Sequence, residues 1–225
     1  MFFLALIAIL ALASWAQYQV SHQFHKYSQE ANRRHLTGAE AAAAVLRAHG
    51  VSGVGIERCS GHLTDHYDPR DNTIYLSDKV YNSPTIAAVG VACHEAGHAC
   101  QYAADYFPIR VRTAIIPLCQ FGSAFSYILI AIGLFLYSQS WFGIGVVLFS
   151  LTTLFQLVTL PVEFNASRRA LETIEGEGLL YEDEYYGARK VLTAAALTYV
   201  AALLTSLLYL LHYVLIFLNM SGRDD

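Results

Sequence analysis

Four long apolar segments constrain the fold of this chain more than any other feature of its sequence. They cover residues 2–16, 114–137, 141–160 and 191–218, and none of them contains Lys, Arg, Asp or Glu. A helix of about 20 apolar residues is long enough to span a bilayer. Charged residues make up only 14% of the chain, against about a quarter in soluble domains. The sequence therefore predicts a polytopic α-helical membrane protein with about four transmembrane helices.

The first apolar segment is the shortest, and its end, Ala13-Ser14-Trp15-Ala16, resembles a signal-peptide cleavage site. A signal peptide, however, begins with a positively charged stretch. No Lys or Arg precedes this segment, and the basic residues follow it instead. We therefore expect a retained membrane anchor.

The basic residues predict the orientation of the chain. Nine of the 14 Lys and Arg residues lie between Lys26 and Arg112, and four more form the pairs 168–169 and 189–190. Cytoplasmic loops carry an excess of Lys and Arg, so we expect a multi-pass protein of the cell (inner) membrane with both termini outside. The expected organisation is a transmembrane anchor at 1–18, a cytoplasmic region at 19–113, a transmembrane hairpin at 114–160, a cytoplasmic segment at 161–190, a transmembrane helix at 191–218 and a short external tail at 219–225.

The first cytoplasmic region is expected to contain two helices. One begins at a capping box, in which Thr37 and Glu40 satisfy each other's backbone, and ends before Gly50. The other, of about 20 residues, is expected to have Pro84 at its first position and to end near Tyr106.

Three short strands are expected between these helices, so the region should form a small α+β unit. A strand is predicted at 54–59, and alternating residues predict a β-hairpin of strands at 62–67 and 73–77. Tyr75 is expected on an edge strand, where an extended peptide could add by backbone pairing.

The second helix carries the motif His94-Glu95-Ala96-Gly97-His98. Two histidines four residues apart lie on one face of a helix, so both rings can bind one zinc ion. Glu95 stands next to the first histidine, where a carboxylate can take the proton of a zinc-bound water, as in HExxH metalloproteases. Cys93 and Cys100 flank the motif and are expected to pack as small apolar residues.

A third zinc ligand must come from outside the motif. The extended metzincin pattern is excluded, because it needs Gly and His where this chain has Gln101 and Ala104. Glu163 is the best candidate, since it follows the third apolar segment and a carboxylate at a membrane edge needs a cationic partner. The alternative is an ordinary helix-end carboxylate that pairs with Arg168 or Arg169.

The chain resembles the YugP-like neutral zinc metallopeptidases of bacterial membranes along nearly its whole length. The resemblance rests on the zinc motif and on the segments at 64–70 (Thr-Asp-His-Tyr-Asp-Pro-Arg), 161–164 (Pro-Val-Glu-Phe) and 190–200. More distantly, the chain is similar to membrane zinc peptidases of the heat-shock and CAAX-processing type.

This resemblance implies a zincin-like fold for the cytoplasmic unit and one zinc ion per chain. It implies His94, His98 and Glu163 as the zinc ligands and Glu95 as the general base. The mechanism would be peptide hydrolysis by a zinc-activated water, without a covalent intermediate.

Near the expected third ligand, this chain departs from the pattern of the family. Related peptidases usually carry an Asp near the third ligand, whereas this chain has Asn165 and Ser167. Both are expected to support the ligands by hydrogen bonds. His66, or His62 in the same predicted strand, could stabilise the transition-state oxyanion, although a local role in holding the hairpin is favoured.

These features predict a membrane-embedded zinc metalloendopeptidase, a hydrolase that cuts membrane-proximal or flexible protein segments. Expected partners are the lipid bilayer, a peptide or protein substrate, and a membrane-protein partner or a second copy of the chain. Nucleic acid and ATP are not expected, because the net charge is −4 and no phosphate-binding G-x-x-x-x-G-K-[ST] loop occurs. A zinc-stabilised membrane scaffold without proteolytic activity is the main alternative. A transporter is disfavoured, because His212 is almost the only ionisable side chain in the four segments.

Overall fold

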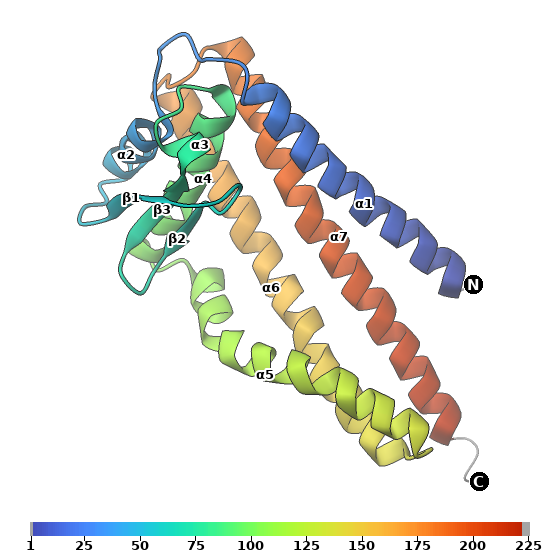
Figure 1. Ribbon diagram of the computed structural model, residues 1–225. Helices are drawn as coiled ribbons and strands as arrows, with labels where there is room; N and C mark the ends of the chain where they lie inside the picture. The colour runs from blue at the N-terminus through green and yellow to red at the C-terminus, as the bar shows by residue number, and fades with distance from the viewer. Residues whose placement is uncertain (1, 222–225) are drawn as a thin grey trace. The chain divides into compact units, whose positions relative to one another are not determined.

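The structure is a computed structural model that describes residues 2–221. Its elements, in chain order, are α1 (Phe2–Tyr27), α2 (Gly38–Ala48), β1 (Gly55–Cys59), β2 (His66–Asp68), β3 (Thr73–Ser77), α3 (Asp78–Tyr81), α4 (Ile86–Ala103), α5 (Phe107–Phe135), α6 (Gln139–Gly176) and α7 (Glu182–Ser221) (Figure 1). The chain divides into two compact units. We call them the helical unit, made of Met1–Trp15, Arg110–Leu160 and Thr198–Asp225, and the mixed unit, made of Ala16–Ile109 and Pro161–Leu197.

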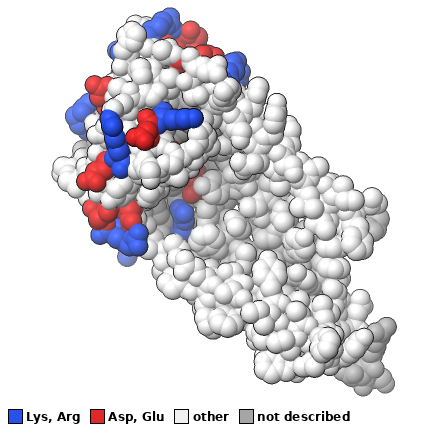
Figure 2. Space-filling model, viewed as in Figure 1, with Lys and Arg blue, Asp and Glu red and all other residues white. Residues whose placement is uncertain are grey.

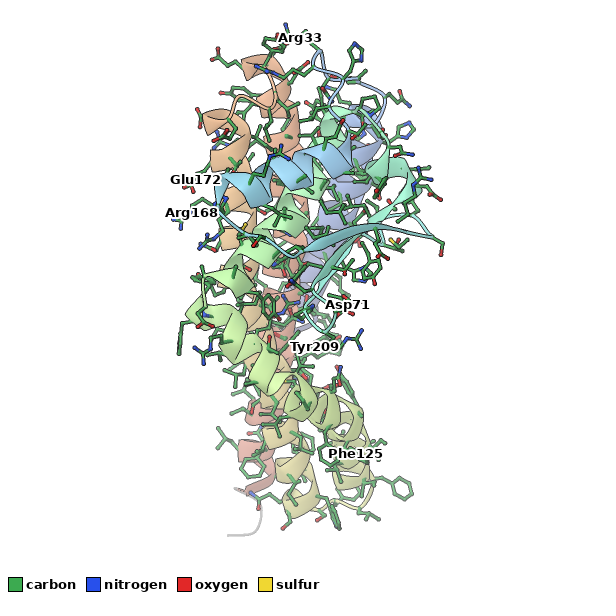
Figure 3. The ribbon with its side chains drawn as sticks, turned by 90° about the vertical axis from the view of Figure 1, so that its left-hand side faces the viewer. Arg33, Asp71, Phe125, Arg168, Glu172 and Tyr209 are labelled. Atoms are coloured by element: carbon green, nitrogen blue, oxygen red, sulfur yellow. The ribbon has the colours of Figure 1, made fainter. Side chains whose placement is uncertain are left out.

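Four helices, α1, α5, α6 and α7, are long and apolar enough to cross a membrane. This finding confirms the predicted mostly helical fold with four long apolar helices and a small sheet. In the helical unit, large apolar side chains remain exposed, among them Phe121, Phe125 and Leu211, and Phe125 projects from α5 in Figure 3. An apolar surface of this extent is typical of contact with lipid.

The four helices extend beyond the apolar segments that predicted them. Helix α1 continues to Tyr27, α5 begins at Phe107, and α7 begins at Glu182. Helix α6 runs through Pro161 to Gly176, so the end of the apolar segment at residue 160 does not mark the end of the helix. The reason is that hydropathy reports only the apolar part of a helix, whereas the polar ends are held by packing in the mixed unit. Glu163 therefore stands on the same helix as the third apolar segment.

Helices α5 and α6 form an antiparallel hairpin inside the helical unit. A Cβ on Gly133 would lie 2.4 Å from the backbone nitrogen of Phe142, and one on Gly145 would lie 2.7 Å from that of Ile130. Only glycine permits so close an approach of two backbones. On α7, His212 stacks on the ring of Phe2 with centroids 3.6 Å apart.

The sheet of the mixed unit has the order β1-β3-β2. The predicted hairpin is present, since β2 and β3 pair antiparallel, although β2 is restricted to His66–Asp68. The prediction that Tyr75 lies on an edge strand is wrong. Tyr75 pairs with Glu57 of the parallel strand β1 on one side and with His66 of β2 on the other. Strand β3 is therefore central, because the parallel pairing of β1 covers the edge that a hairpin alone would leave open.

The capping box at the start of α2 is present as predicted. The Glu40 backbone N–H donates to Thr37 Oγ1 at 3.3 Å, and the Thr37 N–H donates to the Glu40 carboxylate at 2.9 Å. The second of these bonds stabilises the charged carboxylate and lowers the pKa of Glu40. The helix ends at Ala48, and Gly50 follows with φ +65°.

Helix α4 begins two residues later than predicted. Thr85, not a residue before Pro84, is its N-cap and accepts a hydrogen bond from the Ala88 N–H at 3.3 Å. The difference arises because Thr85 forms an isolated antiparallel bridge with Ala31 and the Pro84 carbonyl accepts from the Asn32 N–H. These contacts keep the backbone extended as far as Thr85. The helix ends at Ala103, close to the predicted end.

Helix α4 is the centre of the mixed unit. Its buried residues join one apolar cluster with residues of α2, β3, α6 and α7, including Val45, Leu76, Val89, Ile174 and Leu192. Polar groups cover this cluster from outside, and Figure 2 shows that charged side chains on the viewed face gather over α2, the sheet and the neighbouring loops. The zinc motif is thus carried by the most enclosed helix of the unit.

Candidate metal centre

Gly97, in the middle of the zinc motif, lets α4 approach α6. A Cβ at this position would lie 2.6 Å from the carbonyl oxygen of Ala166 on α6, which is closer than two such atoms can come. Only glycine fits there without moving one of the helices. Because His94 and His98 lie one turn apart on either side of Gly97, the close approach brings both rings to α6.

Three side chains converge where the two helices meet. His94 Nε2 lies 3.4 Å and His98 Nε2 lies 3.6 Å from Glu163 Oε2. All three candidate ligand atoms lie within 4.8 Å of one another. Glu163 is only 2% exposed, so its carboxylate depends on these neighbours rather than on bulk water for stabilisation.

The orientation of the His98 ring is fixed by a chain of hydrogen bonds. Gln101 Nε2 donates to the Val162 carbonyl at 2.7 Å and to Asn165 Oδ1 at 3.0 Å. A backbone carbonyl can only accept, so this end of Gln101 must be the amide nitrogen and the other end the oxygen. Gln101 Oε1 lies 3.0 Å from His98 Nδ1, which must then carry the proton. The Nε2 lone pair of neutral His98 consequently points at Glu163.

His94, like His98, is held by a hydrogen-bond partner at Nδ1, the ring nitrogen that faces away from Glu163. Its Nδ1 lies 3.0 Å from the hydroxyl of Ser167 on α6. Asn165 does not contact either histidine by a hydrogen bond. It accepts from Gln101 at 3.0 Å and from Arg169 Nε at 2.9 Å, so it acts on His98 through Gln101. Ser167 and Asn165 therefore support the two rings separately, Ser167 by direct contact with His94 and Asn165 through Gln101.

This donor set fits a zinc ion. Tetrahedral zinc with Zn–N and Zn–O distances near 2.1 Å places neighbouring ligand atoms about 3.4 Å apart. The observed separations of 3.4 and 3.6 Å match that value and are too long for strong hydrogen bonds. The Nε2 lone pair of neutral His98 and the Glu163 carboxylate repel one another unless a cation lies between them. With the distal nitrogens held by Gln101 and Ser167, the arrangement is the one that metal-binding histidines show.

Electrostatics at the ligands agree with a need for positive charge. Burial by itself lowers the pKa of His98, but the Glu163 carboxylate outweighs that effect, and the pKa lies above its ordinary value. Without a metal ion, His98 thus gains a proton more readily because of Glu163. A divalent cation at the same place satisfies the same negative potential.

Glu95 lies on the next position of α4 and is 9% exposed. Burial raises the pKa of its carboxyl group, and the charges of Glu163 and Asp65 raise it further, against the opposing effect of His94 and His98. A carboxylate with a raised pKa accepts a proton more readily, which is the property that a general base needs.

The other residues singled out in the sequence lie elsewhere. His66 is exposed, with its Nδ1 2.7 Å from the Thr64 carbonyl and its ring stacked on Tyr75, so both of these contacts are local to the sheet. The ring of His62 lies against Phe24. Cys93 and Cys100 are 0% and 1% exposed within the apolar cluster, as expected for packing residues.

Gln101 is the residue that sequence reasoning missed. In the sequence it stands out only as a mismatch to the metzincin pattern, yet it is fully buried and orients His98. Its position three residues after His98 puts both side chains on one helix face, and this spacing is the signal that could have revealed it. Both arginines near Glu163 have other partners: Arg168 pairs with Glu172 at 3.7 Å, and Arg169 donates to Asn165. Arg168 and Glu172 are labelled on α6 in Figure 3.

Comparison with known proteins agrees with the geometry. A family model described as "Putative neutral zinc metallopeptidase" matches residues 2–218. The "Putative membrane protease YugP" of Bacillus subtilis (strain 168) is 46% identical over 225 residues, which cover 100% of this chain and 99% of that protein. No solved structure matches the chain.

The family description names zinc as the metal, and the structure brings together His94, His98 and Glu163 as a candidate triad for it. The match covers almost the whole chain, including all four apolar helices, and the curated relative is described as a membrane protein. The chain therefore belongs to the membrane-associated neutral zinc metallopeptidase family that this model describes.

Proposed function

We propose that the protein is a zinc-dependent metalloendopeptidase of the membrane, with one zinc ion per chain held by His94, His98 and Glu163. The observation that carries the proposal is the convergence of two imidazole nitrogens on a buried carboxylate, with both rings braced from behind. A scaffold that used the metal only for cohesion would not need a carboxyl group of raised pKa beside it, as Glu95 provides.

The residues of the chain divide the work of hydrolysis between them. A bound zinc ion supplies Lewis-acid chemistry, which polarises a carbonyl group and acidifies water. Glu95 takes the proton from the attacking water and delivers it to the leaving amine. Gln101 and Ser167 keep the two histidine rings in place while these transfers occur.

The fold around the site is proposed to work in the manner of a zincin. A small sheet packs beside the metal-binding helix α4, and strands β1 and β2 form its two edges. An extended peptide could add to the free edge of β2, which contacts α4, by backbone hydrogen bonds. Substrate would then be bound in an extended, unfolded conformation.

The site is proposed to act at the cytoplasmic surface of the membrane, with residues 19–113 and 161–190 inside the cell. Three residues separate the end of α4 at Ala103 from the start of α5 at Phe107, and Glu163 stands three positions after the end of the apolar segment 141–160. Both sources of ligands are therefore tied by the chain itself to helices that can cross a membrane. Substrates are expected to be juxtamembrane or flexible segments of proteins.

Comparing cleavage by the wild type and the Glu95→Gln variant tests this function. Each protein is purified and incubated with candidate membrane proteins, and the cut sites are mapped by mass spectrometry. Glu57→Gln, which changes an exposed carboxylate on β1, is the matched control. The proposal expects cuts near membrane boundaries with the wild type and the control, and none with Glu95→Gln. Equal cleavage by Glu95→Gln, or cuts centred in transmembrane helices, would contradict it.

A further inference from the structure

A cavity of the mixed unit lies between the end of α1 and the start of α7, and none of the three candidate metal ligands lines it. Its volume is about 410 Å³, within the range of small-molecule sites. Gln19 and Gln23 line it from α1, and Tyr186, Arg189, Lys190 and Leu197 line it from α7. The two helices are packed closely here, because a Cβ on Gly187 would lie 2.7 Å from the Tyr27 ring.

The charge of this cavity is entirely positive. Its lining, as far as the described residues show, contains Arg189 and Lys190 but no carboxylate. Neither cation forms an ion pair in the part of the chain that the structure describes. The nearby carboxylates at the start of α7, Asp183 and Glu184, form ion pairs with Arg33 instead. The amides of Gln19 and Gln23 and the Tyr186 hydroxyl add uncharged hydrogen-bond donors. Such a lining suits an anion with several acceptor oxygens.

The neighbouring cavity between α6 and α7 lacks this character. It is also lined by Arg189, but its lining includes two carboxylates, Glu172 and Glu175, and Glu172 pairs with Arg168. Opposite charges therefore balance in that cavity, and an anion gains little by entering it. The excess of positive charge is specific to the side of α7 that faces α1.

The cavity lies where both helices change from polar to apolar sequence. On α1, the uncharged apolar stretch ends at Ala16, and Gln19 and Gln23 follow within two turns. On α7, the apolar stretch begins at Val191, immediately after Arg189 and Lys190. The sequences of both helices thus indicate, independently of one another, that the cavity lies at the level of lipid headgroups. Leu197 extends the lining two turns into the apolar part of α7.

We propose that this cavity binds the phosphate group of an anionic phospholipid, with Arg189 and Lys190 as its main contacts. Basic pockets between membrane helices are suited to anionic headgroups, and the apolar end at Leu197 suits the first methylene groups of an acyl chain. A free phosphate ion would use the polar end alone. The lipid would tie α1 to α7 without taking part in the chemistry of the candidate metal centre.

Native mass spectrometry of the full-length protein in detergent tests the proposal. Phosphatidylglycerol, phosphatidylcholine, glycerol phosphate and inorganic phosphate are each titrated against the wild type and the variants. The double variant Arg189→Gln/Lys190→Gln is expected to bind phosphatidylglycerol about 30-fold more weakly, since each cation near a membrane surface contributes on the order of one kcal/mol. The double variant Arg47→Gln/Lys79→Gln, which loses the same charge from exposed positions outside the cavity, should bind like the wild type.

A substitution that preserves side-chain shape provides a second, independent test of the proposal. Gln23→Glu keeps the shape of the cavity and both cations but adds a carboxylate, so it should also weaken binding of phosphatidylglycerol. Zinc content equal to that of the wild type shows that each variant is folded. Undiminished phosphatidylglycerol binding by the folded cavity variants would overturn the proposal. So would equal binding of phosphatidylcholine and phosphatidylglycerol by the wild type, or binding of glycerol phosphate or inorganic phosphate as strong as that of the lipid.

Discussion

The Nδ1 of His98 lies 3.0 Å from the Oε1 of Gln101, three residues later on the same helix. This contact fixes which nitrogen of His98 carries the proton, because Gln101 itself is oriented by the carbonyl of Val162. The Val162 carbonyl on α6 orients the buried amide of Gln101 on α4, and this amide in turn orients the His98 lone pair that would bind the metal. Metal affinity should therefore depend on a residue that does not touch the metal.

Replacing Gln101 by leucine is expected to lower zinc affinity about 10–100-fold, the usual effect of losing a hydrogen-bond partner of a metal-binding histidine. The similar volume of leucine limits the effect on packing. Competition with a chromophoric zinc chelator measures the affinity. Gln29→Leu, which removes an exposed glutamine in contact with His25, is the control and should bind zinc like the wild type. Unchanged affinity in Gln101→Leu would show that the amide does not orient the ligand.

Gly97→Ala should destabilise the protein by about 1–3 kcal/mol, as overpacking of a close helix contact does. The added Cβ would meet the Ala166 carbonyl at 2.6 Å, so α4 and α6 must move apart, and the histidines move away from Glu163. Thermal unfolding and zinc content measure the two effects. At Gly176, the last residue of α6, an added Cβ would meet no atom within 4 Å among the described residues. Gly176→Ala should therefore leave both quantities unchanged, and an equal loss in the two variants would contradict the account of Gly97.

Sequence patterns predicted the elements of the fold that depend on local chemistry. The capping box of Thr37 and Glu40, the β2–β3 hairpin and the four apolar helices all follow from residues close together in the chain. The central position of β3 was not predictable in this way. It depends on β1 pairing in parallel with β3, which is a contact between distant residues that leaves no mark in the alternation of either strand.

In the candidate site, too, the features that depend on local spacing were predictable and those that depend on contacts between distant residues were not. The spacing of His94 and His98 indicated a metal site by itself, and the proximity of Glu163 to them is a finding of the structure. The spacing of Gln101 from His98 is visible in the sequence, but its orienting role is not, because that role requires the Val162 carbonyl of another helix. The predicted start of α4 is wrong for a related reason, since the bridge of Thr85 to Ala31 overrides the local preference for proline in a first helical turn.

Cys93 and Cys100 should resist alkylation in the folded protein. Burial raises the pKa of the Cys100 thiol to about 11 and holds that of Cys93 well above its ordinary value. The reactive thiolate of Cys100 is thus present at about one part in a thousand at pH 8 and increases only as the pH approaches 11. Maleimide labelling followed by peptide mass spectrometry measures this, with labelling in denaturant as the positive control. Rapid labelling of either residue in the native protein at pH 8 would be incompatible with the burial described.

The proposed orientation predicts which positions can be labelled from outside the cell. In a variant without the four native cysteines, Arg70→Cys should be protected from a membrane-impermeant reagent and Ser140→Cys should react. Both positions are exposed in the structure, so protection at position 70 reports on the side of the membrane rather than on burial. Efficient outside labelling at position 70 would reverse the assignment of residues 19–113 to the cytoplasm.

Zinc analysis of two purified variants, Glu163→Ala and Glu95→Gln, tests the central claim most directly. Glu163 is proposed as a ligand on α6 and Glu95 as a proton carrier on α4, so the two carboxylates should differ in their effect on metal binding. The account predicts about one zinc ion per chain in the wild type and in Glu95→Gln, and loss of zinc from Glu163→Ala. If Glu163→Ala retains zinc with the affinity of the wild type, the convergence of Glu163 with His94 and His98 is not a metal site.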